Sequence, residues 1–260
     1  MDIIQFFEEA EANGLVHFTL NEGERQQFLD SLPEDYCLNY ISRKSLATQA
    51  GQNGMGESDF FEQFKIPETP AYANVRSGDF GEMLCFLLMK NKGSQNGITL
   101  VAPRKWRWKA DKNKPCHGSD VVLFHRHDTN PSEHDRVEAI ESKMKAVASN
   151  ASPIQSAIVG AVDDKVKRLA KTLNWLHDRL ATEGKPRLRE AINRYRLLDE
   201  NPTYQKKFHA VAILDNDFVD DEIGKDRSLE DNDIKVTVVS MQDLKTAYES
   251  TYNAMINSLP

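Results

Sequence analysis

Three charged residues able to do chemistry together, Asp120, Glu141 and Lys143, lie in or beside two segments typical of β-strands. A short apolar run follows Asp120, and a second strand pattern, beginning at Val137, leads into Glu141. If these strands pair, the three side chains meet, with Glu141 and Lys143 on one face because strand neighbours alternate. Two carboxylates offer the oxygen ligands that divalent cations prefer, and an adjacent ammonium can orient a water molecule. The set is suited to metal-dependent phosphodiester hydrolysis, although Glu-x-Lys on a strand is also common as a solvated ion pair.

Further elements must position these residues. Apolar residues at helical spacing predict a buried helix over residues 77–90, with Glu82 near its start. Apolar residues recurring every three or four positions predict a second helix, of about seven turns, over residues 154–180. The remaining expected elements are strands over 98–101, 120–125, 136–143, 209–214 and 234–240 and helices over 187–198 and 242–257. This order predicts an α/β domain over residues 71–260, with a mixed central sheet flanked by helices.

The first 70 residues are expected to form a small N-terminal α+β appendage, with a possible role in docking a partner. Residues 6–10 suggest a short helix, and residues 15–19 suggest a strand. A capping pattern at residues 21–24 predicts a helix that Pro33 closes, before a second strand at 36–41. Residues 48–70 are rich in Gly, Gln, Asn, Ser and Pro, which predicts a loop and a domain boundary.

Composition predicts a cytoplasmic globular protein. The chain has 260 residues, of which 40% are hydrophobic and 28% charged. No segment approaches the ~20 apolar residues of a membrane span. The 3 cysteines are widely spaced and odd in number, which fits neither a disulfide framework nor a zinc site. A reducing cytoplasm is therefore the expected compartment.

Charge is distributed unevenly along the chain. The net charge of −7 divides into −9 for residues 1–70 and +2 for residues 71–260. Within the second part, residues 104–114 combine basic side chains with two tryptophans; the basic residues include Arg104, Lys105, Arg107 and Lys109. Cations can neutralise phosphates and aromatic rings can stack on bases, so this segment is the expected DNA-binding patch. A solvated basic loop with its tryptophans in the core is the alternative.

The order of these elements and motifs resembles the core of the PD-(D/E)xK nucleases, which have a restriction-endonuclease-like fold. The resemblance rests on Gly81-Glu82 in the first helix, Gly118-Ser119-Asp120, and Glu141-Ser142-Lys143. Ser119 stands where that pattern commonly has proline. With His117 before Gly118 and the Arg-Lys at residues 104–105, the chain more narrowly resembles HamA, the nuclease family of Hachiman anti-phage defence systems.

The resemblance implies a role for each motif residue. Asp120 and Glu141 would bind Mg²⁺ or Mn²⁺, together with the carbonyl of Ser142, and Lys143 would position the attacking water. Glu82 would hold a second metal ion or a metal-bound water, although a carboxylate near a helix start also favours the helix dipole without any catalytic role. Gln155 resembles a glutamine that some nucleases place near their site, and the alternative is an exposed residue of a first helical turn.

Two functions from different classes follow. The resemblance implies a metal-dependent deoxyribonuclease, the effector subunit of a defence complex, controlled by a superfamily 2 helicase partner. The chain has no Gly-x-x-x-x-Gly-Lys phosphate loop, so an ATP-dependent step is expected in another protein. The alternative is a catalytically silent interaction subunit with a nuclease fold. The presence of Asp120, Glu141 and Lys143 together favours the enzyme.

Overall fold

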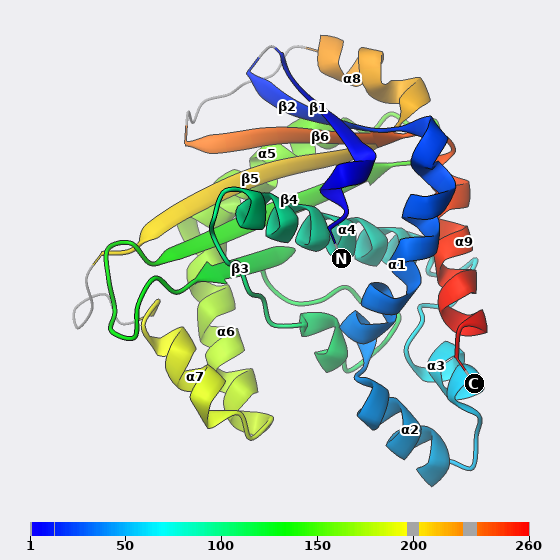
Figure 1. The fold of residues 1–260 in the computed structure, drawn as a ribbon, viewed down its shortest axis with the longest axis vertical. Coiled ribbons are helices and arrows are strands. Elements are labelled where there is room, and N and C mark those ends of the chain that lie inside the picture. Colours follow the sequence, from blue (N-terminus) through cyan, green and yellow to red (C-terminus); the bar gives the residue numbers. More distant parts are fainter. Residues whose placement is uncertain (1, 13, 197–202, 226–232, 260) are drawn as a thin grey trace.

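A computed structural model describes residues 2–12, 14–196, 203–225 and 233–259. These residues form one six-stranded mixed sheet in the order β1-β2-β6-β5-β4-β3 (Figure 1). The strands are β1 (Phe7–Ala12), β2 (Leu15–Leu20), β3 (Val121–His125), β4 (Arg136–Lys145), β5 (Gln205–Asp215) and β6 (Ile234–Met241). Neighbours from β2 to β4 run parallel, while the edge strands β1 and β3 are antiparallel to their partners. The expected mixed sheet flanked by helices is confirmed.

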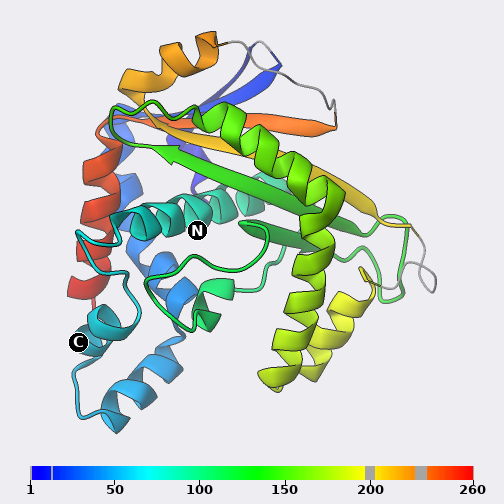
Figure 2. The same cartoon turned by 180° about the vertical axis from the view of Figure 1, so that it is seen from behind.

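Helices cover both faces of the sheet (Figures 1 and 2). One face carries α1 (Arg25–Tyr40), α4 (Ala73–Gln95) and α9 (Leu244–Asn257), and the other carries α5 (Pro153–Asp163) and α6 (Leu169–Thr182). The strands serve both faces because neighbouring residues alternate. In β5, Val211 and Ile213 pack on the α4 side, whereas Ala210 and Ala212 pack on the α5 side.

The long helix expected over residues 154–180 is present, with one change in its winding. A five-residue π-helical segment, η4 (Asp164–Arg168), joins α5 directly to α6. Such segments shift the side chains that follow and frequently lie at functional sites. The other helices are α2 (Arg43–Gln52), α3 (Glu57–Phe64), α7 (Pro186–Asn193) and α8 (Val219–Gly224), with short 3₁₀ turns η1 (Ile4–Phe6), η2 (Glu22–Glu24), η3 (Lys105–Trp108) and η5 (Asn216–Phe218). The end of the helix expected over 187–198 lies outside the described residues.

Several local predictions are wrong. Residues 7–12 form β1 rather than a helix, because they close a hairpin with β2 through Gly14, whose φ is +74°. Pro33 lies inside α1 instead of ending it, and residues 36–40 are the end of that helix rather than a strand. Residues 98–101 contribute only a bridge from Val101 to Phe124.

The segment expected to be a loop, residues 48–70, contains the second half of α2 and all of α3. Ser42 caps α2 by accepting a hydrogen bond from the backbone N–H of Ser45, and this cap stabilises a helix that begins before the glycine-rich stretch. The buried side chains of Phe60 and Phe61 then hold α3 against the core, so tertiary packing outweighs the composition.

Residues 1–70 share the core of the rest of the chain instead of forming an appendage. β2 pairs in parallel with β6, and α1 packs against α9. The buried Tyr36 hydroxyl donates to the carbonyl of Phe80 (3.1 Å), and the Tyr40 hydroxyl donates to Asp79 (2.7 Å). Residues on the two sides of the expected boundary at residue 70 therefore share one hydrophobic core. Among the described residues, no helix has the length and apolar character needed to cross a membrane.

Candidate active site

The pairing of β3 with β4 brings Asp120, Glu141 and Lys143 together. Val121 lies opposite Ile140, so Asp120, which precedes Val121, lies beside Glu141. The ammonium of Lys143 contacts Glu141 Oε1 and lies 3.7 Å from Asp120 Oδ2. It also donates a hydrogen bond to the backbone carbonyl of Ser142 (3.2 Å). Three oxygen atoms from two strands thus surround one positive charge.

This arrangement of oxygen atoms fits a divalent cation. Carboxylates and backbone carbonyls are the hard ligands that Mg²⁺ and Mn²⁺ accept, and here all three already face a cation, the Lys143 ammonium. In the described part of the chain, no three His, Cys, Asp or Glu side chains are grouped to hold a metal. The protein side chains available to a metal here are therefore the two carboxylates Asp120 and Glu141, and water and substrate oxygens must complete a coordination shell.

Both carboxylates are held in place by neighbouring groups. Asp120 Oδ2 accepts a hydrogen bond from the backbone N–H of Ser142 (2.9 Å). Glu141 is only 3% exposed, and its pKa is raised by burial and then by the charge of Asp120. Lys143 and Arg168 oppose that rise in the Glu141 pKa by favouring the ionised carboxylate.

Arg168, at the end of η4, contacts Glu141 from the helix that packs on this face of the sheet. Its guanidinium contacts Glu141 Oε2, and it also donates to Asp164 Oδ1 (2.6 Å) and to the carbonyl of Gly160 (2.8 Å). Gly160 permits this close packing, since a Cβ atom there would overlap the Glu141 carboxyl group. The four-residue spacing of Asp164 and Arg168 was a usable signal for their pairing, but nothing in the sequence linked Arg168 to Glu141.

A buried network connects the π-helical segment to the strand that carries Asp120. The Ser119 hydroxyl donates to Asp164 (2.6 Å), and the Ser119 backbone N–H donates to the Thr172 hydroxyl (2.9 Å). Gly118 precedes this contact with φ +84°, a conformation that favours glycine, and a side chain there would overlap Thr172. The Gly118-Ser119 pair therefore fixes where Asp120 enters the site.

Glu82 has its direct partners outside the group of Asp120, Glu141 and Lys143, although its charge interacts with that of Asp120. Its carboxylate accepts a hydrogen bond from the indole N–H of Trp106 (3.1 Å) and forms an ion pair with Lys105 (3.2 Å). Burial raises the pKa of Glu82 to about 8, with further contributions from nearby acids and opposition from Lys105. Lys105 also donates to the carbonyl of Ser119 (2.9 Å), so this group supports the strand entry at Asp120 from the α4 side.

The expected DNA-binding patch is directed largely into the protein. Lys105 is 6% exposed, and the ammonium of Lys109 donates to the buried carboxylate of Asp79 (2.8 Å to Oδ1). Arg107 donates through Nε to the carbonyl of Leu38 (2.9 Å), and Nη1 of Arg104 is buried without a hydrogen-bond partner among the described residues. Several basic side chains of this segment, which includes η3, therefore pair with acids and carbonyls of the protein. The alternative, a solvated basic loop with its tryptophans in the core, holds for the buried Trp106 but not for Lys105 and Lys109.

Gln155 lies in the first turn of α5 and is half-buried. A different set of basic residues borders the site. Lys167 and Lys171 are exposed on η4 and α6, and Arg168 between them contacts Glu141. The sequence alone does not separate the exposed Lys167 and Lys171 from the half-buried Arg168, because a helix presents basic residues on more than one face.

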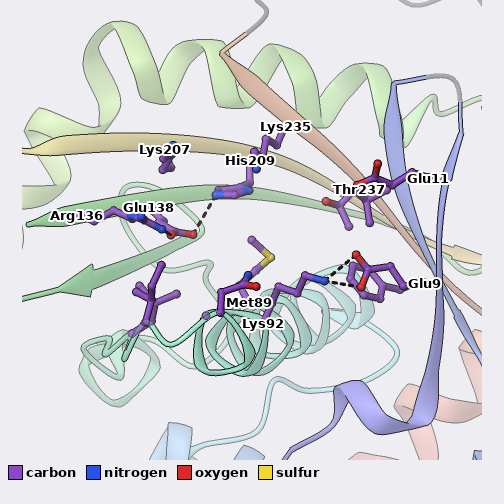
Figure 3. Close-up of a pocket in the computed structure, with 16 residues that line it drawn as sticks. Glu9, Glu11, Met89, Lys92, Arg136, Glu138, Lys207, His209, Lys235 and Thr237 are labelled. Atoms are coloured by element: carbon purple, nitrogen blue, oxygen red, sulfur yellow. Dashed lines mark hydrogen bonds and ion pairs between the residues drawn. The ribbon is translucent and has the colours of Figure 1, made fainter. Parts of the chain in front are cut away.

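A separate pocket of 290 Å³ lies at the other end of α4 (Figure 3). His209 Nε2 lies 3.1 Å from Glu138 Oε2 within it, and Lys92 forms an ion pair with Glu9. Glu138 faces α4, whereas Glu141 three residues later faces α5. The pocket is thus distinct from the candidate site.

Comparison with known protein families identifies the family of this chain. The family model of HamA matches residues 2–255 of the 260. No match is found among curated proteins. The matched region includes the whole sheet, both layers of helices and every residue of the candidate site. The chain therefore belongs to the HamA family.

Proposed function

We propose that this chain is a metal-dependent deoxyribonuclease, the effector subunit of a Hachiman anti-phage defence complex, with a PD-(D/E)xK core. Family membership supports the assignment to a defence system. The observation that carries the enzymatic proposal is the convergence of the Asp120 and Glu141 carboxylates and the Ser142 carbonyl on the Lys143 ammonium. A structural role alone gives no reason to bury a carboxylate such as Glu141 beside a second acid, because burial disfavours its charge.

Each residue of the group has a role in phosphodiester hydrolysis. Asp120 and Glu141 would hold Mg²⁺ or Mn²⁺, with the Ser142 carbonyl as a further ligand. The bound cation would neutralise phosphate charge and lower the pKa of a water molecule. Lys143, beside both carboxylates, would orient the attacking water and stabilise negative charge that develops in the transition state. Arg168 is a positioning residue, because it fixes the Glu141 carboxylate from the α6 side.

Other contributions to the proposal are less direct. We assign Glu82 to positioning, since it binds Trp106 and Lys105 instead of joining the carboxylate pair. DNA is the proposed substrate and a superfamily 2 helicase the proposed partner. The acidic residues 1–70, although part of the core, expose carboxylates such as Glu8 and Glu11 that are available for docking to that partner.

The experiment that tests this function measures DNA cleavage by the purified chain, alone and with its partner. Wild-type protein is expected to cleave DNA with Mg²⁺ or Mn²⁺ and not with EDTA. Glu141→Gln and Lys143→Met should each reduce cleavage by at least about 100-fold, the effect of losing one stabilising group in a transition state. Each variant should keep the circular dichroism spectrum and the cooperative unfolding of wild type, which separates loss of chemistry from loss of fold.

A contaminating nuclease is controlled for by purifying all variants identically. Cleavage by Glu141→Gln at the wild-type rate would refute the enzymatic proposal. Absence of cleavage by the wild-type complex under all metal conditions, with the complex still assembled on DNA, would favour the silent interaction subunit instead.

A further inference from the structure

A second pocket, of 410 Å³, opens beside the candidate active site. It lies between the loop at His117-Gly118 and the η4–α6 helix, which contributes Lys167, Arg168, Lys171 and Trp175. Its volume is within the ~300–1,000 Å³ typical of sites for small organic groups. The proposed catalytic roles leave this pocket unexplained, apart from Arg168.

An aromatic side chain is held firmly at one end of the pocket. Trp175 is half-buried and packs edge-on against Trp108, with ring centroids 5.9 Å apart and an interplanar angle of 66°. The ring of the exposed His117 lies 6.3 Å from that of Trp175. An indole braced in this way can stack on a planar ring without first losing much conformational freedom.

Positive charge lies one helical turn from this indole. Lys171 is exposed and precedes Trp175 by four residues, so the two share a face of α6. Lys167, one turn earlier, is exposed and forms a 2.9 Å ion pair with Asp163, which also lines the pocket. Arg168 is engaged by Asp164 and Glu141, so the charge available to an anionic ligand comes first from Lys171 and then from Lys167, which a phosphate would share with Asp163.

The pocket and the catalytic carboxylates share their boundary. Gly118 lines the pocket two residues before Asp120, and Arg168 lines it while contacting Glu141. A polymer that placed one unit in the pocket would therefore bring its next linkage toward Asp120 and Lys143. Along the η4–α6 helix, Trp175, Lys171 and then Arg168, which contacts Glu141, follow the order base, phosphate, scissile phosphate.

We propose that this pocket binds an unpaired nucleotide of single-stranded DNA, with its base on Trp175 and His117 and its phosphate on Lys171 and Lys167. This proposal rests on the proposed nuclease function and specifies its substrate as a single strand. A duplex presents only its phosphates to a protein surface unless a base leaves the stack, so it would leave the aromatic end of the pocket unused. Aromatic stacking beside a basic groove is the general means of holding single strands.

The test measures binding of fluorescein-labelled oligonucleotides by anisotropy, with the full chain in EDTA at about 50 mM salt, where phosphate contacts are strong. Wild-type protein is expected to bind a single strand of thymidine nucleotides more tightly than a hairpin duplex. Trp175→Leu should weaken single-strand binding about 5- to 150-fold, the effect of one lost base stack. Trp175→Phe, which keeps an aromatic ring, should retain most of the affinity, and its thermal unfolding controls for loss of fold.

Lys44→Ala is the matched charge control. Lys44 is exposed on α2, far from α6 in Figure 1, so this variant should bind as wild type does, while Lys171→Ala should bind more weakly. Duplex binding as tight as single-strand binding, tighter binding of RNA of the same sequence, or unchanged affinity in Trp175→Leu would each overturn the proposal. Metal-dependent cleavage that persists alongside such a result would leave the nuclease function standing and remove only the single-strand site. Absence of cleavage together with Trp175-dependent single-strand binding would support the single-strand site and contradict the nuclease function.

Discussion

Two basic segments on opposite faces of the sheet use positive charge in different ways. On the α4 face, Lys105 and Lys109 are buried against Glu82 and Asp79, where they hold a loop to the core. On the η4–α6 helix, Lys167 and Lys171 are exposed, and Arg168, like Lys143 of β4, contacts the buried Glu141. Buried ion pairs are costly to break because one partner is left without compensation, whereas exposed cations are free to meet phosphates. Position relative to the core, rather than the density of charge along the chain, thus separates structural cations from those available to bind DNA.

The largest expected effect comes from breaking a buried pair. Lys109→Met leaves the Asp79 carboxylate, 1% exposed, with the Tyr40 hydroxyl as its remaining side-chain donor among the described residues, so the unfolding free energy should fall by about 3–5 kcal/mol. The matched change on the other face, Lys171→Met, should alter it by less than about 0.5 kcal/mol. Urea denaturation of both variants measures the difference. Equal unfolding free energies for the two variants would contradict the proposed difference between the buried Lys109 and the exposed Lys171.

A second prediction concerns the close approach of α5 to Glu141. Gly160→Ala adds a methyl group where the Glu141 carboxyl group lies, so that carboxylate must move. Cleavage should fall by about 100-fold, the effect of a displacement of roughly 1 Å at a catalytic group. The control is Gly78→Ala in α4, where the added methyl meets nothing within 4 Å and activity should be unchanged. If the two alanine variants cleave equally well, the Glu141 carboxylate does not need its present position.

A third prediction uses pH. Burial raises the pKa of Glu82 to about 8, above its ordinary value of 4.5. A carboxyl whose folded pKa is raised contributes stability that is full below the unfolded pKa and is lost as pH rises through the folded pKa. The unfolding free energy of wild type should therefore decrease relative to that of Glu82→Gln between about pH 5 and pH 8. Parallel pH profiles for the two proteins, from urea denaturation, would contradict this environment for Glu82.

The smallest effect expected is on salt dependence. Each phosphate contact to a single strand contributes about 0.7 to the slope of log affinity against log salt. Lys171→Met should reduce that slope by up to this amount, because the exposed ammonium would meet a phosphate. Lys44→Ala should leave the slope unchanged. A slope that is the same in Lys171→Met and wild type would place the phosphate contact elsewhere.

Sequence reasoning succeeded where local pattern and burial agree. The sequence predicts the strands around Asp120 and Glu141, and the structure contains both. It also predicts that Glu141 lies beside Lys143, because side chains two residues apart on a strand share a face. The long helix through residues 154–180 follows in the same way from its apolar spacing. These elements contain the core of the candidate site.

The remaining features depended on tertiary contacts that the sequence does not reveal. Tyr36 and Tyr40 favour strands by residue type but lie on one buried face of α1. Lys105 and Lys109 looked solvated because the acids that bury them, Glu82 and Asp79, lie more than 20 residues earlier. The contact between Arg168 and Glu141 crosses from helix to strand, and only the packing around Gly160 creates it.

Direct measurement of metal binding tests the central claim that Asp120 and Glu141 form a cation site. Titration of the full chain with Mn²⁺, followed by the loss of the free-ion signal in electron paramagnetic resonance, reports binding without requiring activity. We expect wild type to bind Mn²⁺ and the double variant Asp120→Asn, Glu141→Gln to lose that binding while remaining folded. Glu82→Gln, altered on the α4 face, should retain it. Mn²⁺ binding that is unchanged in the double variant, or absent from folded wild type with DNA present, would contradict the account.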